Sequence, residues 1–84
     1  MKTRKFKIFA DAAEITAEVT PTMEALGDQP WRVHLYDLGD GLLLNEEAII
    51  TVAGCAHDAA MKVSKDWMAS QGLPTEIYKI TRNA

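Results

Sequence analysis

Cys55 and His57 are the two reactive side chains that lie closest together in the sequence. A thiol at the N-terminus of a helix can act as a nucleophile when a neighbouring histidine serves as its base. A separation of two residues, however, places these side chains on different sides of a helix. A small buried residue near the helix cap explains Cys55 more simply. We therefore interpret Cys55 as structural and expect that the protein is not an enzyme.

Arg32, His34 and Tyr36 form a second candidate group because they alternate along one expected strand. Such a trio could bind an anion or contribute acid–base chemistry. The sequence places no second histidine and no carboxylate pair of fixed geometry beside it, and polar faces of antiparallel strands usually meet solvent. We therefore expect the trio to face solvent, where His34 could still belong to a contact surface.

Oxygen-bearing side chains gather around the turn expected at residues 38–41. They are Asp37, Asp40, Asn45, Glu46 and Glu47. Oxygen donors in this number can hold calcium or magnesium, but the alternating donor spacing of an EF-hand loop is missing and a solvated turn explains the same composition. The chain also has no glycine-rich loop followed by Lys-Ser or Lys-Thr, which a P-loop requires. We expect neither a metal nor a cofactor.

The section from Asp11 to Asp58 is strongly acidic, with ten carboxylates and a single cation, Arg32. Its formal charge is −9, whereas the whole chain of 84 residues has a charge of −3, because the segments before and after it are basic. An acidic surface flanked by basic ends favours steering toward a cationic partner. We expect that partner to be a protein with a cationic surface, such as a host complex that binds nucleic acid.

Carboxylates and threonines alternate with apolar residues in segment 14–24. In a strand, alternate residues lie roughly 6.6 Å apart on one face, near the spacing of successive backbone phosphates. Carboxylates there could imitate a nucleic-acid strand, although a solubilising surface explains the same charge. The expected partner-binding residues fall in two patches, one on this segment and one around the turn: Glu14, Glu18, Glu24, Asp28, Asp37, Asp40, Glu46 and Glu47.

A short basic strip at the N-terminus has phenylalanines between its charges. Its residues are Lys2, Arg4, Lys5, Phe6, Lys7 and Phe9. This interleaving is typical of nucleic-acid-binding proteins. The strip has only four charges, however, and the isoelectric point is about 5.2, whereas a phosphate-binding module is expected to be basic overall. We expect no direct nucleic-acid binding, and the strip could instead pair with acidic neighbours in the sheet.

The bulk composition is that of an ordinary small globular protein, with 48% apolar and 25% charged residues. We expect a single domain over residues 1–84, folding alone or as a small homo-oligomer. One cysteine, Cys55, excludes an internal disulfide and favours a reducing cytoplasm. Asp11 and Glu14 interrupt the N-terminal apolar stretch, and no apolar run reaches the ~18 residues of a membrane span, so we expect neither export nor membrane insertion.

Alternation of apolar and polar residues predicts strands. They cover Lys5–Ala10, Glu14–Leu26, Trp31–Asp37, Ala48–Ala53 and Glu76–Thr81. A short helix from Ala12 to Val19, capped by Asp11, remains an alternative, but several β-branched residues and Pro21 favour the strand. Because Pro21 cannot donate a ladder hydrogen bond, we expect its strand to lie at an edge of the sheet or to carry a bulge.

From Ala56 the apolar spacing changes to steps of three and four, which predicts a helix. Its expected buried stripe is Ala56, Ala59, Ala60, Val63 and Trp67, with Met61 and Met68 off the stripe and available for contacts. Gly72 and Pro74 mark its end. The sequence therefore predicts an α+β fold: a mainly antiparallel sheet of four to five strands with one long helix on one face, in the order β-β-β-β-α-β.

Three segments together resemble small phage-encoded anti-CRISPR proteins. They are the Thr/Glu strand Glu14–Thr20, the strand that runs into an alanine-rich helix at Ile50–Ala60, and the closing strand. The resemblance implies a non-catalytic inhibitor, acting in the host bacterial cytoplasm, that binds a CRISPR effector, type I above all, and blocks target-DNA binding through an acidic surface. The basic N-terminus departs from a pure DNA mimic.

One alternative does not involve DNA mimicry. The protein would then be a structural or accessory interaction domain that uses the Met61/Met68 side of the helix or the strand containing Pro21. Its binding would depend little on salt.

Overall fold

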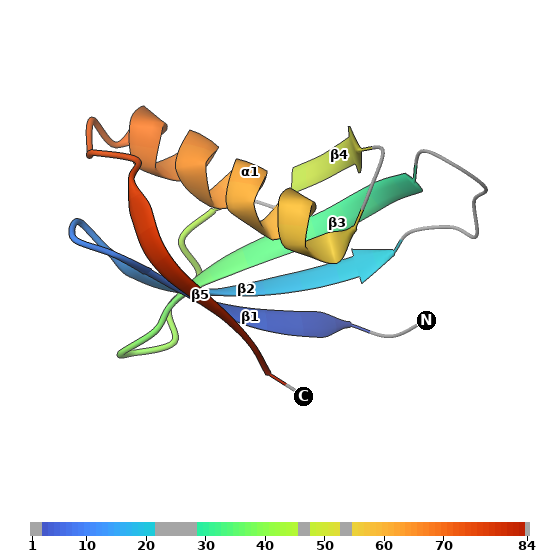
Figure 1. Cartoon of the computed structure of the whole chain (residues 1–84), viewed down its shortest axis with the longest axis horizontal. Coiled ribbons are helices and arrows are strands. Elements are labelled where there is room, and N and C mark those ends of the chain that lie inside the picture. Colours follow the sequence, from blue (N-terminus) through green and yellow to red (C-terminus); the bar gives the residue numbers. More distant parts are fainter. Residues whose placement is uncertain (1–2, 22–28, 46–47, 53–54, 84) are drawn as a thin grey trace.

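The elements of the fold follow one another in the order that the alternation pattern predicts. The computed structural model describes residues 3–21, 29–45, 48–52 and 55–83. It contains β1 (Arg4–Ala10), β2 (Glu14–Pro21), β3 (Gln29–Asp37), β4 (Ala48–Val52), α1 (Ala56–Ser70) and β5 (Ile77–Asn83). The five strands form one antiparallel sheet in the order β4-β3-β2-β1-β5, and α1 lies across one face (Figure 1). The predicted α+β architecture is confirmed.

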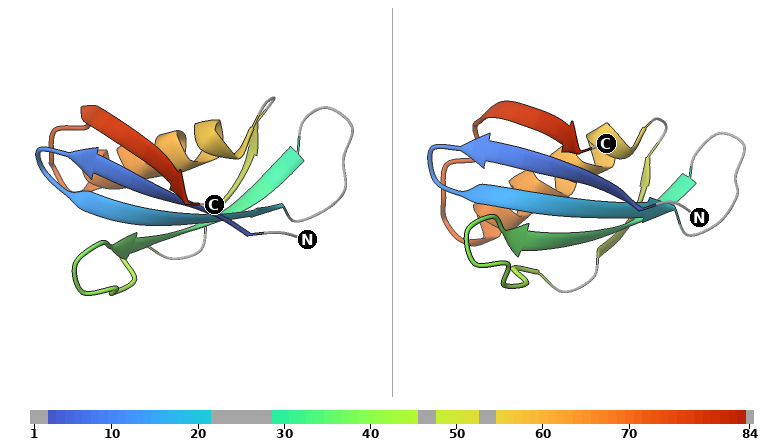
Figure 2. Two further views of the ribbon diagram at one scale, coloured as in Figure 1. Left: turned by 60° about the horizontal axis from the view of Figure 1, so that its bottom comes forward. Right: turned by 90° about the horizontal axis from the view of Figure 1, so that it is seen from below.

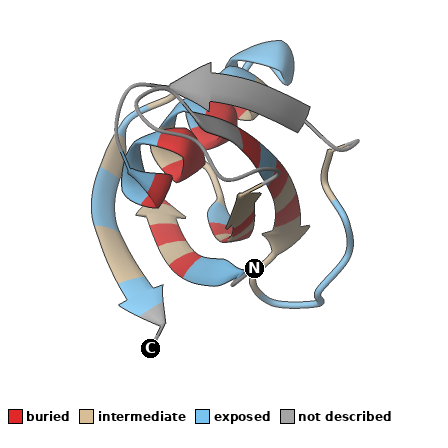
Figure 3. Ribbon diagram, turned by 90° about the vertical axis from the view of Figure 1, so that its right-hand side faces the viewer, coloured by how far each residue is buried: buried red, intermediate tan, exposed pale blue. Residues whose placement is uncertain are grey.

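The core lies between α1 and the sheet, and the strand alternation selects its residues. From β1, β2 and β3 come Phe6, Ile8, Ala10, Ile15, Ala17, Val19, Trp31, Val33 and Leu35. From α1 come Ala56, Ala59, Ala60, Val63 and Met68. Figure 3 shows these buried positions as bands that face one another across the two layers. Small alanines on the first turns let α1 approach the sheet closely, so a thin two-layer core can exclude water.

Every second residue of β1, β2 and β3 points away from α1, onto what we call the outer face. Among the described side chains this face comprises Lys5, Lys7, Phe9, Glu14, Thr16, Glu18, Thr20, Arg32, His34 and Tyr36. Lys79 and Thr81 of β5 join it, since they pair with Phe9 and Lys7. The right-hand view of Figure 2 looks onto this side of the sheet, with α1 behind it.

The strand containing Pro21 lies in the middle of the sheet, so the expectation of an edge position or a bulge was wrong. β2 pairs with β1 on one side and β3 on the other without a register shift. The ladder with β1 ends at Val19, whereas Pro21 is the last residue of β2 and pairs only with Trp31. A proline is tolerated there because the strand ends with it. The same strand assignment excludes the alternative helix over Ala12–Val19, and the predicted continuation from residue 22 to 26 lies outside the described residues.

The C-terminus of α1 buries Met68, contrary to the expectation that it lies off the buried stripe. Gly72 has φ of 72° and closes the helix, as predicted. Leu73 donates its backbone N–H to the carbonyl of Met68 and Gly72 donates to Ala69, both at 3.0 Å, which is a Schellman motif. This motif brings Leu73 against the core beside Met68, whose side chain is fully buried. Trp67, expected as the last residue of the buried stripe, is only partly buried.

Candidate functional site

Two turns that are distant in sequence lie at the same end of the sheet. The β1–β2 turn is closed by a hydrogen bond from the N–H of Ala10 to the carbonyl of Ala13 at 2.9 Å. The β3–β4 loop begins beside it, because Asp37 pairs with Ile15 in the β2–β3 register. Both turns lie at the left in Figure 1. The pairing therefore brings Asp11 and Glu14 to the same end as Asp37 and Asp40.

The carboxylates of the β3–β4 loop hold its backbone. Oδ2 of Asp37 accepts hydrogen bonds from the backbone N–H groups of Gly39 and Asp40, each at 3.0 Å. Oδ1 of Asp40 accepts from the N–H of Leu42 at 2.9 Å. Gly41 has φ of 76°, a conformation that glycine adopts readily. The loop is therefore a rigid Asx-type turn rather than a loose acidic segment.

Hydrogen bonds to the ionised form lower the pKa of Asp37. The largest cause is the backbone N–H of Asp40, partly opposed by desolvation, with the N–H of Gly39 and the Asp40 side chain adding to the lowering. Asp37 therefore stays negatively charged at a lower pH than an ordinary aspartate, and the hydrogen bonds that hold the turn persist with that charge.

Asn45 anchors the far side of this loop rather than contributing a metal ligand. Its Oδ1 accepts a hydrogen bond from the N–H of Leu35 at 2.7 Å, and its Nδ2 donates to the carbonyl of Val33 at 3.4 Å. Across the residues that the structure describes, no three His, Cys, Asp or Glu side chains are placed to share a metal ion. Among the described oxygen-bearing residues, Asp37, Asp40 and Asn45 each hydrogen-bond to the backbone of this region.

Exposed apolar side chains accompany the carboxylates at this end, and sequence reasoning missed them. Within the described ranges, the large apolar residues that stand clear of the surface are Leu42, Leu43 and Tyr78, with 66%, 55% and 66% of their area exposed. Leu42 and Leu43 lie in the β3–β4 loop, and Tyr78 occupies the register shift where β5 pairs with the end of β1. The one sequence signal for them is the leucine run 42–44, which fits no strand or helix period.

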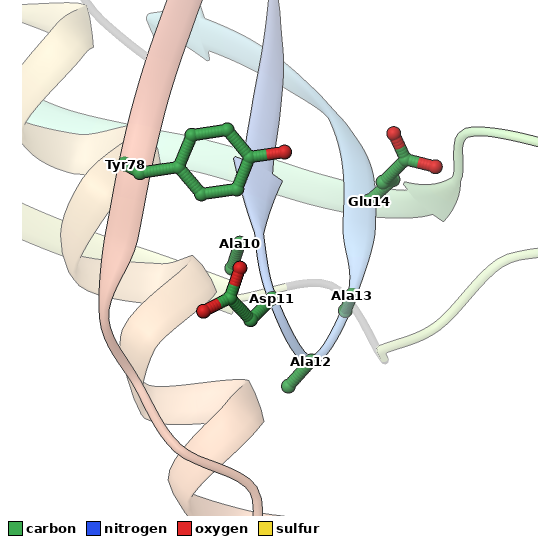
Figure 4. Close-up of a pocket in the computed structure, with 6 residues that line it drawn as sticks. All are labelled: Ala10, Asp11, Ala12, Ala13, Glu14 and Tyr78. Atoms are coloured by element: carbon green, nitrogen blue, oxygen red, sulfur yellow. The ribbon is translucent and has the colours of Figure 1, made fainter.

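A shallow depression of about 460 Å³ lies between Tyr78 and the β1–β2 turn. Its lining residues are Ala10, Asp11, Ala12, Ala13, Glu14 and Tyr78. Figure 4 shows the ring of Tyr78 reaching from β5 toward β1, with the carboxylate of Asp11 beside the turn and that of Glu14 beyond β2. Alanines, two carboxylates and a phenol provide a contact surface but no nucleophile paired with a base. We call Asp11, Glu14, Asp37, Asp40, Leu42, Leu43 and Tyr78 together the acidic end.

Glu18 lies away from the acidic end, in the middle of the outer face. Its Oε2 is 3.7 Å from Nζ of Lys5, the residue opposite it on β1. Both side chains are partly exposed, so this ion pair contributes at most about 1 kcal/mol. The basic strip thus pairs with an acidic neighbour in the sheet at this position. The outer face of β2 therefore does not present its carboxylates as an uninterrupted negative row.

The remaining predicted partner-binding residues cannot be placed in this site. Glu24, Asp28, Glu46 and Glu47 lie outside the described residues. Of the eight expected positions, the structure brings Glu14, Asp37 and Asp40 together and sets Glu18 apart.

Cys55 and His57, the two reactive side chains closest in sequence, lie at the N-terminus of α1. Cys55 is the N-cap residue of α1 and is exposed, which corrects the expectation of a buried residue: a cap precedes the buried stripe, which begins at Ala56. The ring of His57 packs edge-on against Phe6, with centroids 6.0 Å apart. Nδ1 of His57 is 3.7 Å from Oδ1 of Asp58. His57 is therefore engaged by neighbours other than the thiol.

The polar trio of β3 lies on the outer face as expected. Arg32 is exposed and the other two residues are half-buried. The rings of His34 and Tyr36 are 6.4 Å apart and tilted by 44°. His34 and Tyr36 therefore form an aromatic pair on the outer face.

The fold and the site define a small antiparallel α+β protein whose acidic end combines carboxylates with exposed apolar side chains. No family model, curated protein or solved structure matches the chain. In the described part of the chain, no helix has the length and apolar character needed to cross a bilayer.

Proposed function

We propose that the protein is a non-catalytic inhibitor that binds a CRISPR effector complex, type I above all, and blocks its target-DNA binding. The observation that carries the proposal is the acidic end, where the exposed apolar residues Leu42 and Leu43 of the β3–β4 loop and Tyr78 of β5 lie at the same end of the sheet as four carboxylates, Asp11, Glu14, Asp37 and Asp40. Exposed apolar residues with a polar rim are characteristic of a protein interface.

The two kinds of side chain have different tasks. Carboxylates steer the protein toward a cationic groove and raise the rate of encounter. Leu42 and Leu43 then supply apolar area that is buried in the complex, at roughly 25 cal/mol per Å² removed from water. The rigid loop lowers the entropy cost of binding, because Asp37 and Asp40 already fix its backbone.

A CRISPR effector fits as the target because its DNA-binding surface is cationic, and a protein seated there excludes the nucleic acid. The resemblance of the strand Glu14–Thr20 and the alanine-rich helix to phage-encoded inhibitors supports this choice of target. The inhibitor would act in the cytoplasm of the host bacterium. Cations on the described part of the outer face make it less suitable for a cationic groove, so the acidic end is the better contact surface.

A second candidate function is an accessory interaction domain without DNA mimicry, and the exposure of Leu42 and Leu43 favours it. The surfaces first expected for that function are less suitable, since Met68 is buried and β2 is a central strand. In that case binding would rest on apolar burial and change little with ionic strength.

The test uses purified type I effector complexes, a labelled target duplex and the protein as competitor. We expect the protein to prevent duplex binding, and the double variant Asp11→Asn/Glu14→Gln to lose potency, with the loss largest at low salt. Leu42→Ser should weaken inhibition roughly 5- to 30-fold, the effect of truncating an interface anchor.

Asp58→Asn is a control for the loss of one carboxylate elsewhere, because Asp58 lies in the first turn of α1, away from the acidic end. Its charge-matched counterparts are the single variants Asp11→Asn and Glu14→Gln. The potency of Asp58→Asn should equal that of the unaltered protein. The proposal fails if no type I complex is inhibited. Inhibition that ignores salt and survives the carboxylate substitutions, but is lost in Leu42→Ser, would instead favour the accessory interaction domain.

A further inference from the structure

The described part of the outer face is net positive although the chain as a whole is acidic. Its cations are Lys5, Lys7, Arg32 and Lys79, and its carboxylates are Glu14 and Glu18, which leaves an excess of two positive charges. Asp11 and Asp40 lie in turns at one end of the sheet, and Asp37, the last residue of β3, pairs with Ile15 of the core-facing set. The low isoelectric point therefore does not describe this surface, and charge complementarity points to an anionic ligand.

Aromatic rings stand among these cations. Phe9 on β1 and His34 and Tyr36 on β3 all belong to the outer face, and each is partly buried. His34 and Tyr36 lie with ring centroids 6.4 Å apart. Nζ of Lys79 lies over the ring of Phe9, 5.5 Å from its centroid, in a cation–π contact.

The strand register sets these groups in cross-strand rows. One row runs Lys5, Glu18, His34 and the next runs Lys7, Thr16, Tyr36. Because neighbouring strands lie about 4.8 Å apart, the lysines of β1 are roughly 10 Å from the rings of β3, and successive rows are roughly 6.6 Å apart. This spacing allows bases to stack on a ring of β3 while their phosphates pair with lysines of β1.

We propose that the outer face binds single-stranded nucleic acid, with unpaired bases stacking on Tyr36 and phosphates pairing with Lys7, Arg32 and Lys79. An antiparallel sheet that offers aromatic rings between cations suits unstacked bases, whose faces a duplex conceals. The ligand class follows from the two features together, since the cations alone would accept any polyanion. The proposal does not depend on the inhibitor function, because it uses the outer face and not the acidic end.

Fluorescence anisotropy with labelled oligouridylate and oligothymidylate of about 16 nucleotides tests the proposal. We expect both strands to bind, and a duplex of the same length to bind more weakly. With three phosphate contacts, from Lys7, Arg32 and Lys79, the plot of log K against log salt should have a slope of about −2. A difference between the two oligonucleotides would show whether the 2′-hydroxyl contributes.

Variants with matched controls separate stacking from charge. Tyr36→Leu removes the aromatic ring but keeps an apolar side chain of similar reach, and should weaken binding about 5- to 100-fold, whereas Tyr36→Phe should bind normally. Lys7→Ala should make the salt slope less steep by about 0.7. Tyr78→Leu at the acidic end and Lys65→Ala on the exposed side of α1 should leave both quantities unchanged.

Two sets of results would overturn the proposal. The first is the absence of binding by either oligonucleotide at low salt, or equal loss in the control variants. The second is an affinity for heparin equal to that for the oligonucleotides, together with no effect of Tyr36→Leu. That result would mean that the surface binds any polyanion through charge alone. Thermal melts monitor folding; should Tyr36→Leu unfold, the salt slopes of Lys7→Ala and Lys65→Ala still decide between the outer face and another surface.

Discussion

Leu38 donates its backbone N–H to the carbonyl oxygen of Glu14 at 3.0 Å, and this hydrogen bond ties the β3–β4 loop to the first residue of β2. The contact joins two segments that the sequence presents as separate acidic patches. It makes them one surface because β2 and β3 are neighbours in the sheet. The acidic end therefore consists of residues that strand pairing brings to one end of the sheet, and not of the acidic section as a whole.

Protonation of Asp37 should release the β3–β4 loop. The lowered pKa means that the ionised form is stabilised in the folded protein, so its contribution to loop stability is fully present above the ordinary carboxyl pKa of 3.8 and is lost as the pH falls through the lower folded value. We expect the protection of the Gly39 and Asp40 amides, relative to their intrinsic exchange rates, to be lost only below that range. In Asp37→Asn this protection should no longer change with pH there, and a profile like that of the unaltered protein would contradict the assignment.

Gly72 should be required for the end of α1. Its φ of 72° disfavours any side chain with a Cβ, so Gly72→Ala should lower the free energy of unfolding by about 1–2 kcal/mol. The surrounding space is open, which leaves backbone conformation as the only cost. Gly72→Asn is the matched control and should cost less, because asparagine tolerates this conformation. Equal losses in chemical denaturation would argue against a conformational origin.

Met68 and Met61 should respond oppositely to truncation. Met68 is fully buried in the core, so Met68→Ala should cost about 2–5 kcal/mol, whereas partly buried Met61 should lose only about 1 kcal/mol on the same change. Urea denaturation of the two variants provides the comparison. Similar losses for both would indicate that α1 is rotated relative to the described packing.

Alternation in the sequence is enough to predict the core of the three central strands. Ile15, Ala17 and Val19 are buried because a strand places every second residue on one face, whichever neighbours it has. The central position of β2 does not follow from this pattern, because strand order depends on pairing between distant segments. For the same reason the sequence shows charges on Lys5 and Glu18 but not that they lie opposite each other.

The candidate site was predictable only in part, and the limits are physical. Glu14 and Asp37 are recognisable as acidic residues near turns, but their proximity arises from the β2–β3 register. The position of Leu42 follows from the conformation of the β3–β4 loop, and that of Tyr78 follows from the register shift between β1 and β5. Neither feature can be recognised from the periodicity of apolar residues in the sequence. Burial of Met68 likewise depends on how the helix ends, since the Schellman motif folds Leu73 back onto it.

Ser64 offers a direct test of the packing between α1 and the sheet. Its side chain is fully buried in α1, and its hydroxyl has no hydrogen-bond partner among the described residues. A buried hydroxyl without a partner costs roughly 1–3 kcal/mol of desolvation, and alanine favours a helix more than serine does. Ser64→Ala should therefore raise the free energy of unfolding by about 1 kcal/mol, despite the small cavity that it leaves.

Ser70→Ala, in the last turn, is the control. It removes an exposed hydroxyl that donates to the carbonyl of Trp67 at 2.6 Å, and it should not stabilise the protein. A loss of stability in Ser64→Ala by chemical denaturation would show that the hydroxyl is satisfied in solution.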